Sequence, residues 1–194
     1  MSRAAWYFVL AGTVTAIAVA AAAFYLSRYP GNHEVVFVVA LAFFIPGRIS
    51  SFYLKDLYRS RRHLSAEQFD AAIECGRRFL QTLSEEPWRR RLVYLTWSAY
   101  SWNVAAMARN NIGAALMMLG RFDAARWEFQ AALADDPRYA LPYANLAVMA
   151  EVDGDHAAGA RLMAEAHRYG YSGRSADKLL DKVAAAYARV QAGG

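Results

Sequence analysis

Few side chains in this sequence are of a type and spacing that could support catalysis or bind a metal. Histidines are present at positions 33, 63, 156 and 167. None of them pairs with a carboxylate or a cysteine at the spacing of a metal site. Asp153-Gly154-Asp155 is similar to the start of a calcium loop but lacks the ligands that complete one. We therefore predict that the protein is not an enzyme and that it uses no metal and no cofactor.

The distribution of charge argues against a nucleic-acid-binding domain. Residues 1–63 carry seven of the 22 basic residues and two of the 17 acidic ones, so they hold the entire net charge of +5. Residues 64–194 are neutral overall and lack the basic clustering that such a domain requires. We therefore predict no nucleic-acid partner. Cys75 is the only cysteine, which excludes an internal disulfide.

Two apolar segments precede the rest of the chain, and the first covers residues 4–26. It contains no charged residue, and a helix of this length spans the roughly 30 Å hydrocarbon core of a bilayer. A cleaved secretory signal is the alternative, because Arg3 precedes the segment and alanines cluster near residue 20. The segment is longer than the apolar core of a signal, and a second apolar segment follows it. We predict a transmembrane helix.

The second apolar segment, residues 35–54, is interrupted by Pro46-Gly47-Arg48. A span that continues through this interruption is long enough to cross, with a kink at the proline and with Arg48 reaching the headgroups. The alternative is a short half-helix that ends at Pro46 and continues along the membrane interface. We predict the kinked span.

The connector between the two segments, residues 27–34, is short and contains Pro30-Gly31, which predicts an antiparallel helical hairpin. Basic residues cluster after the second segment rather than in the connector. The positive-inside rule then places both termini in the cytoplasm, in a protein of the bacterial inner membrane. The predicted membrane-interface residues are Arg48, Lys55, Arg59, Arg61, Arg62, Trp97 and Trp102.

A 34-residue period begins at residue 106. In the first unit, small and large residues and turn formers stand at Ile112-Gly113, Leu116, Gly120, Phe122, Ala125, Phe129, Ala132 and Pro137. In the second unit, Tyr143 takes the position of Arg109, the other positions recur as Leu146-Ala147, Gly154, Gly159, Met163 and Ala166, and Tyr171 replaces the proline. Such a recurrence predicts two helix hairpins that pack on each other.

This pattern resembles two tandem tetratricopeptide repeats over residues 106–171. One slot departs from the family pattern, with Arg109 in place of tryptophan. The resemblance implies an all-α solenoid of helix-turn-helix units, because each hairpin leaves an apolar face that only a neighbouring hairpin covers.

Residues 59–105 are predicted to hold a degenerate first repeat followed by an aromatic insertion. The segment from Glu67 to Ala72 resembles the turn and second helix of a repeat, but Ala72 lies 53 residues before Ala125 instead of 34. The inserted residues include Trp97 and Trp102 beside arginines, which suits the membrane interface. The alternative is a helix whose aromatic residues pack on the first repeat.

The last segment, residues 172–194, is predicted to contain the capping helix that a repeat array requires, followed by a short tail. Its apolar residues follow a helical period through Leu179, Leu180, Val183, Tyr187 and Val190.

The resemblance also implies a peptide-binding groove lined by the first helix of each unit. Its predicted residues are Met107, Asn110, Asn111, Met117, Met118, Leu141, Asn145 and Val148. In clamp-type members, an asparagine at the position of Asn111 and Asn145 holds ligand backbone or a terminal carboxylate, but the basic partners of that clamp are absent here. The methionines favour an apolar ligand. The alternative is that these side chains contact the capping helix or the insertion.

Together these features predict a transmembrane helical hairpin over residues 1–58 followed by a cytoplasmic repeat domain. The first function that they favour is that of a membrane-anchored adaptor, which contacts the lipid bilayer and binds protein partners through the repeat surface. The alternative is a structural accessory subunit, in which the hairpin packs against other subunits of a larger membrane complex.

Overall fold

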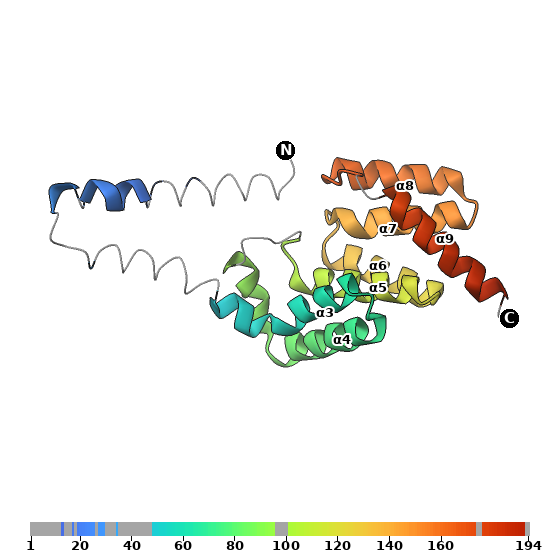
Figure 1. Cartoon of the computed structure of the whole chain (residues 1–194), viewed down its shortest axis with the longest axis horizontal. Helices are drawn as coiled ribbons and strands as arrows, with labels where there is room; N and C mark the ends of the chain where they lie inside the picture. The colour runs from blue at the N-terminus through green and yellow to red at the C-terminus, as the bar shows by residue number, and fades with distance from the viewer. Residues whose placement is uncertain are drawn as a thin grey trace.

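The computed structural model describes residues 13, 17, 19–25, 27–29, 34, 48–95, 101–173 and 176–192. Over these residues the secondary structure is helical and contains no strand, which confirms the predicted all-α class. Figure 1 shows the helices from α3 onward gathered into one stack, with α3 and α4 at one end and α7 and α8 at the other.

The stack consists of three antiparallel helix hairpins within the described residues. Their helices are α3 Lys55–Ser65 with α4 Phe69–Glu85, α5 Val104–Met118 with α6 Phe122–Asp135, and α7 Ala140–Val152 with α8 His156–Arg168. The two helices of each hairpin pack together, α3 and α4 pack on α5, and α6 packs on α7. A 3-10 segment, η1 Pro87–Leu95, lies between the first and second hairpins in the sequence and contacts α4 and α5.

The turn inside each hairpin has the same backbone geometry. Gly120 and Gly154 have φ angles of 75° and 83°, and Glu67 has a φ angle of 57° at the corresponding place in the first hairpin. The next residue donates its N–H to a carbonyl five positions earlier, at 2.9 Å in each case: Gln68 to His63, Arg121 to Leu116 and Asp155 to Ala150. This bond satisfies a carbonyl at the end of the first helix, so the three hairpins end their first helices in the same way.

Small residues allow the helices to approach closely. A Cβ atom on Gly113 of α5 would lie 2.7 Å from Cε1 of Phe129 on α6. A Cβ atom on Gly76 of α4 would lie 2.6 Å from Cγ1 of Ile112 on α5. Phe129, Ala125 and Ile112 are completely buried, so the sites that the 34-residue period marks as small or large belong to the packed core.

The core has two main clusters of buried apolar residues. One joins all three hairpins and includes Ile112, Leu116, Phe129 and Met149, together with Val183 from the last helix. The other lies at the first hairpin, where Leu57, Phe79 and Val93 bring together α3, α4 and η1. The second cluster explains how the 3-10 segment is held, because Leu92 and Val93 are 7% and 1% exposed.

The last helix, α9 Ala176–Ala192, packs on α7 and α5. Among the helices that the structure describes, it makes no contact with α8, the helix that precedes it in the chain. If α9 began a further hairpin of the stack, it would pack on α8, just as α5 of the second hairpin packs on α4 of the first. The segment predicted to cap the array therefore crosses the first helices of the second and third hairpins instead of extending the stack, and Figure 1 shows it oblique to α7 and α8.

The predicted membrane spans, residues 4–26 and 35–54, lie largely outside the residues that the structure describes. Within the described part of the chain, no helix combines the length and the apolar character needed to cross a bilayer.

Candidate functional site

The candidate site lies on the face formed by α3, α5 and α7, the first helices of the three hairpins, which we call the inner face. This face has two regions. One is an open pocket beside the N-terminal ends of α5 and α7. The other is covered by α9.

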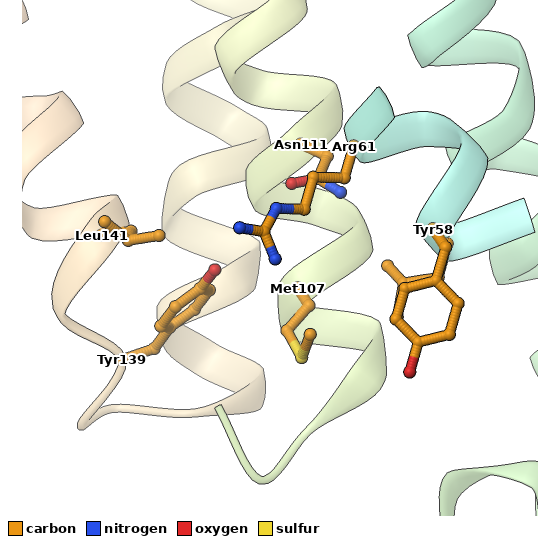
Figure 2. A pocket seen from close by; sticks show the side chains of 7 residues that line it. Tyr58, Arg61, Met107, Asn111, Tyr139 and Leu141 are labelled. Carbon is orange, nitrogen blue, oxygen red and sulfur yellow. The ribbon is translucent and has the colours of Figure 1, made fainter. Parts of the chain in front are cut away.

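The open pocket has a volume of about 240 Å³. Its lining residues come from α3, α5 and the beginning of α7, and they are Leu57, Tyr58, Arg61, Met107, Asn111, Tyr139 and Leu141. Figure 2 shows Arg61 extending from α3 into the middle of this group, with Tyr139 and Leu141 on one side and Tyr58 on the other. Three separate hairpins therefore contribute to a single cavity.

The pocket combines an apolar wall with a few polar groups. Leu57, Met107 and Leu141 supply the apolar surface, and Arg61 is the one charged residue among those that line the cavity. Burial raises the pKa of the Tyr58 hydroxyl, although a hydrogen bond with Ser50 and the charge of Arg61 partly oppose this effect. Tyr58 is therefore a neutral phenol at physiological pH. Such a lining suits an apolar group that carries hydrogen-bond acceptors.

A polar network fixes the ends of the helices that surround the pocket. Asn103 caps α5 by accepting hydrogen bonds from the backbone N–H of Ala105 at 2.9 Å and of Ala106 at 3.3 Å. Its side-chain amide donates to the carbonyl of Asp135 at the end of α6, at 2.9 Å. Ser101 donates to the Asp136 carboxylate at 2.6 Å. These bonds set the start of α5 against the α6–α7 turn, and so they place Met107 opposite Tyr139.

The eight predicted groove residues occupy three different environments. Met107, Asn111 and Leu141 line the open pocket. Asn145 donates a hydrogen bond to Asn110 at 3.0 Å in the interior, where both side chains are buried. The other three lie in or against the main core cluster, which α9 also enters, and they are Met117, Met118 and Val148. For these last residues the structure favours the alternative, contact with the last helix.

Arg61 was predicted to lie at the membrane interface, and the structure shows that its side chain lines the pocket. On α3 it lies one turn after Leu57 and Tyr58, and all three side chains reach the pocket. Its guanidinium is the charged group of the pocket lining. The sequence carries a signal for this, since positions 57, 58 and 61 share one face of a helix.

The other predicted interface residues that the structure describes do not line the pocket. Arg48, Lys55, Arg59 and Arg62 are exposed, Trp102 is half-buried, and Trp97 lies outside the described residues. Arg59 forms an ion pair with Asp56 at 3.6 Å.

Arg89 joins the predicted membrane-proximal segment to the stack. Its Nη1 donates to the carbonyl of Tyr53 at 3.1 Å, and its Nε and Nη2 donate to the Glu86 carboxylate at 3.0 and 2.9 Å. The guanidinium also lies 5.2 Å from the centre of the Tyr53 ring, which packs edge-on against Trp88. The chain before α3 is thus held against η1 by Arg89 and by the packing of Tyr53 on Trp88.

Arg109, the residue that departs from the repeat pattern, connects α5 to α6. Its Nε donates to Asp135 at 2.9 Å and its Nη1 lies 3.4 Å from the Glu128 carboxylate. Its guanidinium also lies 5.6 Å from the centre of the Trp127 ring. Arg109 therefore packs outside the pocket and serves the hairpin rather than a ligand.

Over the residues described, no group of three or more histidine, cysteine or acidic side chains is placed to hold a metal ion. Comparison with protein-family models, with curated proteins and with solved structures finds no match for this chain.

Proposed function

We propose that this protein is a membrane-anchored adaptor of the tetratricopeptide-repeat type, which binds a protein partner in the open pocket of its inner face. The observation that carries the proposal is the meeting of Met107, Asn111 and Leu141 with Arg61 in one cavity. Three of these residues belong to the predicted groove, and the fourth adds a cation to it.

Assignment to the repeat family is supported by two independent features. The sequence repeats its small and large residues after 34 positions, as members of the family do. Gly120 and Gly154, separated by that interval, occupy equivalent turns with the same hydrogen-bond pattern. An ordinary pair of helix hairpins has no reason to repeat both its sequence and its turns.

The membrane anchor is supported by composition and exposure. Residues 4–26 contain no charge. Several large apolar side chains before α3 are exposed, with Ile17 at 63%, Phe24 at 70% and Phe52 at 66%. In water such side chains are unfavourable, whereas in contact with lipid they are stabilised. Basic residues follow at once, which favours a cytoplasmic stack at the inner membrane.

The pocket favours an extended partner segment that inserts an apolar side chain and offers backbone or side-chain acceptors. Methionine, leucine and tyrosine accommodate the apolar group. The Arg61 guanidinium and the Asn111 amide supply donors on one side of it. We propose that the native partner is a protein because the cavity opens on a surface formed by three helices and contains no catalytic group.

The test uses the full-length chain in its native membranes, with a photo-cross-linking amino acid in place of Met107. A control chain carries the same amino acid in place of Trp127, which is 61% exposed on α6 and does not line the pocket. A discrete protein adduct at position 107, absent at 127 and reduced by Arg61→Glu, supports the adaptor function. Identical adducts at both positions, or lipid adducts alone, contradict it.

One observation favours the alternative, a structural subunit of a larger membrane complex. Phe52 and Trp88 are 66% and 45% exposed, and Tyr53 lies between their rings with centroid distances of 5.2 and 5.0 Å. An exposed aromatic group at this position suits packing against another membrane subunit. Co-purification of membrane proteins in mild detergent, lost in Phe52→Ser with Trp88→Ser but kept in Asn111→Ala, distinguishes this function from the adaptor.

A further inference from the structure

The covered region of the inner face holds α9 in the way that a groove holds a helical ligand. The helix runs across α7 and α5 and has no contact with α8 among the described helices (Figure 1). Val183 is completely buried in the main core cluster, next to residues of α5 and α7 that include Leu116, Met117 and Val148. Ala186 is 2% exposed, and Leu180 packs against the same cluster.

The contacts of α9 follow the spacing by which a single helix is recognised in a groove. Leu180, Val183 and Tyr187 are at positions i, i+3 and i+7, which lie on one face. The ring centre of Tyr187 is 4.9 Å from that of Phe122 at the start of α6. Lys182, at i+2, extends toward the α3–α4 turn, where its Nζ lies 2.7 Å from the Glu67 carboxylate.

Few of the described side chains of α9 are buried, namely Val183 and Ala186, and α3 and α8 also have only two buried residues each. Among its described side chains, Val183 is the one large aliphatic residue that is fully buried. The Lys182–Glu67 pair is exposed, with 56% and 63% of the two side chains accessible, and such pairs contribute little to stability. A segment held in this way can be exchanged for another helix that fits the same surface.

Glu67 is the second reason to regard α9 as a ligand of this face. Gly120 and Gly154 fill the corresponding turns of the other hairpins, whereas here a glutamate has a φ angle of 57°. Residues with a side chain adopt this backbone conformation less readily than glycine does. Glu67 therefore places a carboxylate at a turn where the other two hairpins carry no side chain. Lys182 lowers the pKa of Glu67 through its hydrogen bond and its charge.

We propose that the region of the inner face under α9 is a helix-binding groove, that α9 is its intramolecular occupant, and that its partner is an amphipathic helix from another protein. The partner carries aliphatic residues at i and i+3, an aromatic residue at i+7 and a basic residue at i+2 that pairs with Glu67. This inference rests on the proposed function, since it assigns a class of partner to the same inner face. Because α5 borders both the open pocket and the region under α9, release of α9 would expose one continuous surface along α5.

The test is a competition in the full-length chain, purified in detergent, with a fluorescent synthetic peptide of residues 176–192 as the probe. Lys182→Glu in the chain repels its own α9 from Glu67 and leaves the groove unchanged for the wild-type peptide. We expect the peptide to bind this variant roughly fivefold more tightly than it binds the wild-type chain. A peptide with Val183→Glu controls for adsorption to detergent and is expected not to bind.

Hydrogen exchange provides a second measurement that does not depend on the peptide. Amides of α9 should exchange faster in Lys182→Glu than in the wild-type chain, while amides of α6 and α8 stay protected. The reciprocal pair Glu67→Lys with Lys182→Glu should restore the protection. Unchanged protection of α9 in Lys182→Glu, together with equal or absent peptide binding to both chains, overturns the proposal and makes α9 a permanent part of the core.

The two proposals can fail separately. If the cross-linker at position 107 captures no protein while the peptide still binds more tightly to Lys182→Glu, the adaptor function fails and the helix-binding groove stands. If position 107 captures a partner but the peptide result is negative, the partner uses the open pocket and the covered region is structural.

Discussion

Asn145 on α7 donates a hydrogen bond to Asn110 on α5, with 3.0 Å between Nδ2 and Oδ1. The two side chains are 8% and 5% exposed, so the bond lies in the interior between the second and third hairpins. By the 34-residue period, Asn145 corresponds to Asn111, yet it contacts the residue before it. One of the two equivalent asparagines therefore joins neighbouring repeats, and the other, Asn111, faces the pocket.

This division predicts different effects of two alanine substitutions. Asn145→Ala leaves the buried Asn110 amide without its partner, which should lower the free energy of unfolding by about 1–3 kcal/mol. Asn111→Ala should change stability much less and reduce partner cross-linking at position 107. Urea unfolding of the full-length chain in detergent, followed by circular dichroism, measures the first effect. Equal losses of stability in both variants would contradict the different roles assigned to Asn145 and Asn111.

Gly113→Ala should destabilise the second hairpin although alanine favours a helix. The added Cβ would lie 2.7 Å from the ring of Phe129, which is completely buried and has no room to move. We expect a net loss of about 1–3 kcal/mol. Gly159→Ala is the matched control, because its new Cβ meets the flexible side chain of Glu151 and the substitution should be neutral or stabilising. Thermal unfolding of both variants decides the point.

Glu128 predicts a specific pH dependence of stability. Burial raises the pKa of its carboxyl above the ordinary value, and the charge and hydrogen bond of Arg109 offset part of this effect. The folded state holds the proton of Glu128 more firmly than the unfolded chain does. Protonated Glu128 therefore stabilises the folded state, and this stabilisation is fully present below the ordinary pKa. It is lost as the pH rises through the raised pKa of the folded state.

A glutamine at position 128 removes this titration. The melting temperature of Glu128→Gln relative to that of wild type should therefore increase between pH 4 and pH 7. Melting curves at unit pH intervals in one buffer series measure the difference. If the difference in melting temperature instead falls as the pH rises, the ion pair with Arg109 lowers the pKa of Glu128 by more than burial raises it.

Arg89→Lys should loosen the junction before α3 without unfolding the stack. Lysine keeps the charge but cannot donate at once to the Tyr53 carbonyl and to both oxygens of Glu86. Hydrogen exchange of the amides from residue 54 to residue 58 should become faster, while amides of α6 and α8 stay unchanged. Arg90→Lys, on the exposed side of η1, is the control. If residues 54–58 exchange at similar rates in both variants, Arg89 does not hold the junction before α3.

The features that recur in the sequence were the ones that could be predicted. The helices of the second and third hairpins follow from the period, and Gly120 and Gly154 mark their turns because glycine adopts a positive φ without strain. The first hairpin was less clear because Glu67 stands in place of the glycine and residues inserted after α4 shift the register. The predicted hairpin of the membrane segment remains a prediction.

The composition of the pocket could be predicted only in part. Periodicity identifies which side of a helix is apolar, but it does not give the angle at which neighbouring hairpins pack. That angle brings Arg61 next to Met107 and turns Asn145 toward Asn110. The position of α9 was left open for a related reason, since its apolar side fits either the end of the stack or the inner face.

The backbone before α3 sets the direction in which the inner face opens. Residues 48–53 are helical, and Leu54 accepts the hydrogen bond of Tyr58 while its own N–H donates to Ser50. In a nearly continuous helix each residue adds about 100° of rotation. One residue inserted between Arg48 and Leu54 would rotate the whole stack by about that angle around the helix axis relative to the residues before Arg48. If the proposed membrane anchor holds, the inner face would then turn about a quarter turn away from a partner fixed at the membrane.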